Sequence, residues 1–569
     1  MKTWLKRGLI VFLLLIVAMA AVLTYFVYRM EEFQLKSGVS GAYLAARQAT
    51  SLQDTSPAKD YLSLALYLDP DDLEIQRAAL TAYLDDGDIS LAASLAPQML
   101  SDPEVGRDAT LVLVVDAVKH SNYGEARDYL EKLPDGPSSR ILKPLLNAWL
   151  NDAQGESSDF KSLEALLDSG AYLSVTSHQS AILLERSGFV DDAERAYERG
   201  IKSGGMGYSF FALPFEAFLS RNDRSDKAEL VREIIVQRFG NLPQVRIAKA
   251  NWEQGIVNTM ERFSIQQHVA NSLLAFVDAL RADGHAEFAR PYVHLARYLA
   301  PSARAELLLA DMFADEEKWA QAAALYAEVG GDEAYRFAAD IRRAEMHEMK
   351  GDVSGAVDIL QGRLQSDTQT FSARMLLADI HRRQENYAAA ELEYKFILSE
   401  IGPPKKSDWT LMFSLGMCRE RLGRWPEAEA NLTTARRLSD DNPLVLNYLA
   451  YSWIDKGINL DRARSLVEMA VKKSPQNGFY IDSLGWLYFK MGDFDRSILF
   501  LERATQFEPT DPVIADHLGD VLWHAKRETE ARYQWRKALA FDPDDDLREQ
   551  IEKKIIHGPL PPKLGGMDI

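Results

Sequence analysis

The chain has 569 residues, of which 47% are hydrophobic and 26% are charged, a balance typical of folded soluble protein. Its formal net charge of −19 argues against nucleic-acid binding as the main role, because phosphate contacts need clustered lysines and arginines. The single cysteine, Cys418, excludes an internal disulfide and a cysteine-based structural zinc site. This length exceeds what one compact core can organise, so several domains or an elongated repeat architecture are expected.

The chain begins with a segment that predicts a membrane anchor. Residues 1–8 are basic, and residues 9–28 then contain no charged side chain. A helix of this length spans about 30 Å, the hydrocarbon thickness of a bilayer. Basic residues before the span predict an N-terminus in the cytoplasm, with the bulk of the chain in the periplasm at a bacterial inner membrane. A cleaved signal peptide is the alternative, because an A-x-A sequence ends at Ala20.

Behind the anchor, residues 29–40 are expected to form a juxtamembrane linker. Residues 41–403 then show small, large apolar and proline residues at the spacing of helical hairpins, in degenerate repeats. A glycine-rich break near Gly204 interrupts them, but it lacks the Gly-Lys-Ser/Thr ending of a phosphate-binding loop. This region is therefore predicted to be helical and repetitive.

The repeat is strongest at residues 404–556. Gly485 is followed after 34 residues by Gly519, and Ala504 by Ala538. This is the period of the tetratricopeptide repeat (TPR), a pair of antiparallel helices. Neighbouring pairs must stack, because one pair cannot bury its own apolar face. The sequence thus predicts an all-α fold, a TPR α-solenoid of about 13 helical hairpins behind one transmembrane helix.

The end of the chain is expected to close this solenoid. A helix at about residues 547–556 follows the last repeat and should cap its open apolar face. Residues 557–569 contain proline and glycine and predict a disordered tail.

The first helix of each TPR pair lines the concave face, and its positions 2, 5, 9 and 12 point toward a ligand. In the strong repeats these positions hold many aromatic side chains, which are typical binding anchors. They predict a groove for an apolar partner segment that carries Lys or Arg, bound by the rings and by interleaved carboxylates. The alternative is that the chain's own superhelix or C-terminal segment covers the rings. The predicted groove residues are Phe413, Met417, Asn447, Tyr451, Asp482, Trp486, Phe489, Asp516, Asp520 and Trp523.

No constellation of residues indicates catalysis. The histidines are scattered, and no serine or cysteine nucleophile motif is found. The densest cluster of possible metal ligands is Asp516, His517 and Asp520, but the histidine points away from the other two on a helix. We therefore predict no enzyme activity, no catalytic or metal-binding residue and no cofactor. The expected partner is a protein or peptide.

Four segments resemble one family of proteobacterial TPR proteins: LNYLAYSWIDKGINLD, DSLGWLYFKMGDF, DPVIADHLGDVLW and EARYQWRKAL. That family includes the lipoprotein adaptor of a periplasmic carboxy-terminal processing protease, which presents cell-wall hydrolases for degradation. The resemblance covers about residues 409–554 and implies a periplasmic adaptor with such partners. The chain departs from the adaptor in its anchor, because no cysteine follows the apolar run to carry a lipid. A structural subunit or assembly factor of an inner-membrane complex is the alternative function.

Overall fold

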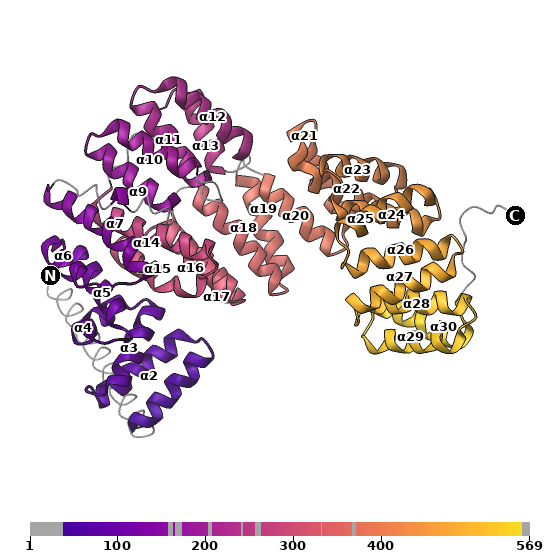
Figure 1. The fold of residues 1–569 in the computed structure, drawn as a ribbon, viewed down its shortest axis with the longest axis horizontal. Coiled ribbons are helices and arrows are strands. Elements are labelled where there is room, and N and C mark those ends of the chain that lie inside the picture. The colour runs from indigo at the N-terminus through magenta and orange to yellow at the C-terminus, as the bar shows by residue number, and fades with distance from the viewer. Residues whose placement is uncertain are drawn as a thin grey trace, which may run out of the picture. The chain divides into compact units, whose positions relative to one another are not determined.

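The computed structural model describes residues 38–156, 163–165, 173–202, 208–239, 243–256, 263–331, 333–366 and 371–559. Every regular element in these ranges is a helix, so the predicted all-α solenoid is confirmed for them. By its internal contacts the chain divides into two compact units. We call Met1–Ile359 the N-terminal unit and Leu360–Ile569 the C-terminal unit. Figure 1 shows both, coloured along the chain.

Parts of the sequence prediction lie outside the described residues. These are the transmembrane span at 9–28, most of the linker at 29–40 and the tail from 560 onward. Among the helices that the structure does describe, none has both the length and the apolar character needed to cross a membrane. The number of hairpins stays a prediction, because the gaps fall in the middle of the chain.

The N-terminal unit opens with a helix at residues 38–51. The helices that follow it are α2 (Thr55–Leu68), α3 (Leu73–Asp86), α4 (Ile89–Met99), α5 (Gly106–Lys119), α6 (Tyr123–Glu131), α7 (Pro137–Gln154), α9 (Leu173–Arg186), α10 (Val190–Lys202), α11 (Tyr208–Arg221), α12 (Ser225–Phe239), α13 (Pro243–Glu253), α14 (Ile265–Ala282), η1 (Ala286–Phe288), α15 (Arg290–Leu299), α16 (Ala303–Asp315), α17 (Trp319–Glu328), α18 (Glu333–Met349) and α19 (Val353–Ser366), the last of which crosses into the C-terminal unit.

The N-terminal unit is more than a simple stack of neighbours, because its later helices return to its first ones. Helix α14 packs on α7, and α15 packs on both α3 and α5. At the first of these contacts the Trp149 indole stacks on the His268 ring, with 3.9 Å between centroids. We call α14, η1 and α15 the return segment. It joins residues from Ala46 to Met312 into one hydrophobic core.

The C-terminal unit is a regular series of hairpins that ends in a single helix (Figure 1). Its helices are α20 (Phe371–Arg383), α21 (Tyr387–Ile401), η2 (Lys406–Asp408), α22 (Trp409–Arg421), α23 (Trp425–Leu438), α24 (Pro443–Lys456), α25 (Leu460–Lys473), α26 (Gly478–Lys490), α27 (Phe494–Phe507), α28 (Pro512–His524), α29 (Glu528–Ala540) and α30 (Asp545–His557). The terminal helix expected near residues 547–556 is present as α30.

A glycine lets the two helices of a hairpin approach closely, as the repeat period predicted. A Cβ atom added to Gly485 would lie 2.7 Å from Cγ of Leu501, and one added to Gly519 would lie 2.4 Å from Nε1 of Trp535. Both distances are too short for a real side chain. The predicted packing role of Gly485 is therefore confirmed, and Ala504 is likewise fully buried.

The turn inside each hairpin needs one residue with a left-handed backbone. Gly423, Gly457 and Gly492 occupy this position with φ between 68° and 77°. Glycine adopts this conformation without steric penalty. The next hairpin has Lys526 there instead, with φ of 68°, so this turn holds a residue with a Cβ atom in a strained conformation that glycine would relieve.

Side-chain caps fix where the last first-position helices begin. Asn477, Asp511 and Asp544 directly precede α26, α28 and α30. Each side chain accepts a hydrogen bond from the backbone N–H three residues later, at 2.8 to 3.0 Å. These bonds satisfy a donor that the helix itself leaves unpaired.

Candidate functional site

The candidate site lies on the first helices of consecutive hairpins in the C-terminal unit. Helix α24 packs beside α26, and α26 beside α28. The ninth residue of α22, α24 and α26 is Met417, Tyr451 and Trp486, and all three side chains are half-buried. We call these three residues the first-helix row. A half-buried thioether and two half-buried rings give this face an apolar contact surface.

Trp486 is held in place by its neighbours. Its indole stacks on the His517 ring of α28, with 4.0 Å between centroids and 13° between planes. On its own helix, Phe489 lies 4.7 Å away, centroid to centroid, and is only 3% exposed. A ring fixed in this way loses little conformational entropy when a partner covers it, which favours a role as a binding anchor.

The imidazole of His517 is fixed in turn by a buried carboxylate. Its Nδ1 lies 2.9 Å from Oδ1 and 3.1 Å from Oδ2 of Asp482. Burial alone would lower the pKa of His517, but Asp482 and the nearby Asp516 and Asp520 outweigh it, so the pKa is raised. The carboxylate therefore favours an imidazolium, which donates from Nδ1 and presents a cationic ring to the face of Trp486.

The other two predicted acidic residues are paired with a lysine of α30. Nζ of Lys554 lies 2.6 Å from Oδ2 of Asp516 and 2.9 Å from Oδ2 of Asp520. Asp520 also accepts a hydrogen bond from Nε1 of Trp535 at 3.1 Å. Burial and the Asp516 carboxylate raise the pKa of Asp520 to about 6. The ammonium group of Lys554 thus sits where a metal ion would have to sit.

The C-terminal segment covers the last ring of the predicted groove. A Cβ atom added to Gly558 would lie 2.4 Å from Cζ2 of Trp523, so the backbone after α30 packs directly on this indole. The guanidinium of Arg532 stands 4.8 Å from the ring centroid. The C-terminal segment therefore covers Trp523, which is the alternative to a binding role that the sequence analysis gave.

The ten predicted groove residues fall into two groups. Phe413, Phe489, Asp482, Asp516 and Asp520 are buried, whereas Met417, Asn447, Tyr451, Trp486 and Trp523 are half-buried. All three members of the first-helix row are therefore partly exposed, whereas the three carboxylates are buried. Whether this face binds a partner stays a prediction.

Sequence reasoning missed the roles of His517 and Lys554, although a pattern could have indicated them. In three first helices the ninth residue is an aspartate that accepts a hydrogen bond from an aromatic side chain 15 residues later. The pairs are Asp311 with Tyr326 at 2.6 Å, Asp379 with Tyr394 at 2.5 Å, and Asp520 with Trp535 at 3.1 Å. An aspartate at this position links the two helices of its hairpin through the hydrogen bond. Its negative charge also requires a nearby cation.

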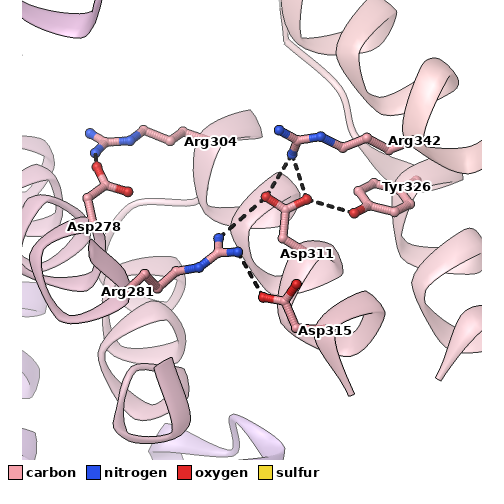
Figure 2. A network of polar contacts seen from close by, with 7 residues as sticks. All are labelled: Asp278, Arg281, Arg304, Asp311, Asp315, Tyr326 and Arg342. Atoms are coloured by element: carbon pink, nitrogen blue, oxygen red, sulfur yellow. Dashed lines mark hydrogen bonds and ion pairs between the residues drawn. The ribbon is translucent and has the colours of Figure 1, made fainter. Parts of the chain in front are cut away.

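Figure 2 shows the same arrangement in the N-terminal unit. The carboxylate of Asp311 receives the hydroxyl of Tyr326 and the guanidinium of Arg342 from α18, at 2.5 and 2.7 Å. Arg281 of the return segment reaches the same carboxylate and bonds Asp315 at 2.9 Å. Lys554 of α30 therefore corresponds to Arg342, the cation that the next repeat supplies to Asp311, and α30 acts as a final half-repeat.

Comparison with known proteins identifies the repeat. Residues 413–478 and 482–511 match models of the tetratricopeptide repeat. A TPR repeat-containing protein of Pseudomonas aeruginosa is 29% identical over 113 residues, which are 20% of this chain and 19% of that protein. A BBSome complex member of Bos taurus is 27% identical over 115 residues, 20% of this chain and 22% of that protein. The match thus spans about a fifth of each relative's length.

Two solved structures align with this chain at low sequence identity. The APC/C hetero-tetramer Cut9–Hcn1 aligns with 93% of this chain and 98% of its own, at 15% identity and a TM-score of 0.40. A TPR protein of Parabacteroides merdae aligns with 45% of this chain and 99% of its own, at 13% identity and a TM-score of 0.39. The repeat matches in the C-terminal unit carry the conclusion: this chain contains tetratricopeptide repeats, which form protein-interaction scaffolds.

Proposed function

We propose that the chain is an adaptor that binds a protein partner on the first-helix row of its C-terminal unit. The observation that carries this proposal is Trp486, a half-buried indole on α26 that is fixed by His517 of α28 and has α24, which presents Tyr451, on its other side. Apolar side chains held rigidly at a surface are the usual anchors of an interface. The row runs across several hairpins, so it suits an extended or helical segment of the partner.

The partner should be bound mainly through apolar side chains. The carboxylates of Asp482, Asp516 and Asp520 are already paired with His517 and Lys554. A Lys or Arg of the partner would have to compete with these internal cations. We therefore expect a basic residue in the partner to raise the association rate more than the affinity.

The test is a matched pair of alanine variants in the full chain. Trp486→Ala should weaken partner capture by roughly tenfold or more, because a buried aromatic anchor contributes about 2 kcal/mol. Tyr533→Ala is the control, since its ring is 65% exposed on the second helix α29 and belongs to no predicted groove position. Circular dichroism should show that both variants stay helical. Equal partner capture by the two variants would show that the first-helix row does not bind the partner.

We further propose that residues 9–28 anchor the protein in a bacterial inner membrane, with the repeats in the periplasm. The supporting observation is the uncharged run behind a basic N-terminus. Alkaline phosphatase fused after Ile569 should be active, and the protein should stay in the membrane after a carbonate wash. An inactive fusion would refute the orientation, and a mature N-terminus at Ala21 would show cleavage.

At this location the adaptor would present substrates, such as cell-wall hydrolases, to a carboxy-terminal processing protease, as the sequence resemblance implies. The missing lipidated cysteine favours a second candidate, a structural subunit or assembly factor of an inner-membrane complex. Cross-linked co-purification from membranes distinguishes them. A protease recovered with hydrolases supports the adaptor, whereas a stoichiometric set of membrane proteins supports the complex subunit.

A further inference from the structure

The N-terminal unit contains a cleft of about 800 Å³, well away in sequence from the TPR matches. One wall is formed by the opening helix, α2 and α3, and the other by η1 of the return segment together with α16. This volume lies in the range of sites that bury most of a bound ligand.

The cleft exists because the side chains of one wall are small. Ala78, Thr81 and Ala82 lie on one face of α3, and Ala58 of α2 continues that wall. Helix α15 packs on both α3 and α5, whereas the short turn η1 lines the cleft opposite α3 and leaves this stretch unfilled. On the far side Nζ of Lys318 donates to the backbone oxygen of Gln53 at 2.7 Å, which ties the two walls together.

The charges lining the cleft are mainly negative. Five carboxylates face two guanidinium groups: Asp54, Asp85, Glu287, Asp315 and Glu316 against Arg47 and Arg290. Two of the five are paired, because Glu316 pairs with Arg290 and Lys318, and Asp315 pairs with Arg281. The charge that remains for a ligand is therefore acidic.

Among these carboxylates, Asp85 gives the strongest indication of a ligand. It lines the cleft from α3, and burial raises its pKa. Among the described residues no donor makes a hydrogen bond to its carboxylate, and Arg290 acts on it only at longer range. A half-buried carboxylate without a donor gains from a ligand that supplies one.

We propose that this cleft binds a short segment of a protein partner that carries a Lys or Arg between apolar residues. The cation would pair with Asp85, and the neighbouring side chains would contact Ala58 and Ala78 of one wall and Met312 of the other. This second site lies outside the C-terminal unit, so the chain could hold two segments at once. If the cleft does not bind such a segment, the proposal for the first-helix row still stands.

The test uses the full chain and a fluorescein-labelled, end-capped heptapeptide of alternating leucine and lysine, followed by fluorescence anisotropy. Thr81→Trp fills the cleft from an exposed position and should reduce affinity at least tenfold. Asp85→Asn should reduce it about threefold or more and should flatten its dependence on salt, because an ion pair is lost. Circular dichroism confirms that each variant is folded.

Asp60→Asn on α2 is the matched control, because it removes the same charge at an exposed position outside the cleft. It should leave the affinity unchanged. The corresponding leucine–glutamate peptide should not bind. The proposal is overturned if Thr81→Trp binds the lysine peptide as well as wild type does, or if spermidine alone competes as strongly as the peptide, which would indicate a site for small cations.

Discussion

The two units are built from the same kind of hairpin but bury their helices differently. In the C-terminal unit the first-helix row stays half-buried, whereas in the N-terminal unit the return segment covers α5 and α7. The sequence of α5 explains the difference, because Leu111 to Val115 is an apolar run and every residue in it is buried. A helix that is apolar all round must be packed on all sides. The repeated hairpin therefore determines the local fold. Apolar helix faces that the hairpins leave uncovered determine whether a later segment packs on them.

The units also differ in the ionisable groups they bury. The return segment buries His268 and His294, and burial lowers the pKa of each to about 4 and about 3. The C-terminal unit instead buries pairs, in which His517 and Lys554 meet aspartates. Burying a neutral imidazole stabilises the return segment only while it stays neutral, whereas the paired groups depend on each other.

The strongest way to break the C-terminal arrangement is Lys554→Met. Removing the ammonium leaves Asp516 and Asp520 buried without a cation, which costs about 3–5 kcal/mol when no relaxation follows. Helix α30 can relax by leaving the surface, which would expose Trp523 as well. We expect a lower melting temperature of the C-terminal unit and faster hydrogen exchange in α30.

The neighbouring Lys553→Met is the control for this change. Its side chain is 66% exposed and pairs only with Glu549, so it should shift stability by no more than a few tenths of a kcal/mol. Similar melting temperatures for the two variants would show that Lys554 does not close the repeat stack.

A substitution inside a hairpin tests the packing that both units share. Gly519→Ala places a methyl group 2.4 Å from the Trp535 indole, which cannot bend away as an aliphatic chain can. We expect a loss of about 1–3 kcal/mol in the free energy of unfolding. Gly362→Ala is the control, because this helical glycine has open space around it and should gain up to about 1 kcal/mol. Denaturant melts that rank the two variants the other way would contradict the close crossing.

Mildly acidic pH should change the stability of the two units in opposite directions. Between about pH 6.5 and 4 the unfolded chain binds protons at His268 and His294 that the folded N-terminal unit does not bind. Its stability should therefore fall as pH falls, by up to about 1.4 kcal/mol per pH unit for each histidine. In the C-terminal unit His517 and Asp520 have raised pKa values, so the folded state holds their protons more strongly. The contribution of His517 is fully present below its ordinary pKa of 6.5 and is lost as pH rises, and that of Asp520 increases as pH falls from about 6 to 3.8.

Hydrogen exchange of the full chain, corrected for the intrinsic pH dependence, reads out both effects. Protection of α14 and α15 should fall between pH 6.5 and 5 while that of α26 and α28 is kept. His268→Phe retains a ring against Trp149 and should weaken the acid response of α14. Parallel loss of protection in both units would contradict the assigned shifts.

The spacing of small residues was sufficient to predict the hairpins, because a close helix crossing is a local requirement that Gly485 and Gly519 meet within their own repeat. The row of Met417, Tyr451 and Trp486 was also accessible, since position nine follows from helical geometry. The partners of the buried aspartates could not be predicted from the sequence. Asp516 and Asp520 read as surface acids until α30 is placed over them, and the fate of Lys554 depends on a tertiary contact that no local period encodes. The return segment was missed for the same reason.

The smallest expected effect concerns the turns that continue the repeat. Lys526 adopts φ of 68° where Gly423, Gly457 and Gly492 stand in the preceding hairpins. A left-handed backbone costs a residue with a Cβ atom about 1–2 kcal/mol, and glycine loses part of that gain through the entropy of the unfolded chain. Lys526→Gly should therefore stabilise the C-terminal unit by about 0.5–1 kcal/mol. Gly492→Lys is the reciprocal change: no atom lies within 4 Å of a Cβ atom there, so its cost is purely conformational. If the two substitutions shift the unfolding midpoint in the same direction, the turn is not what limits these hairpins. Opposite shifts of similar size would show that the position carries one backbone requirement in both repeats.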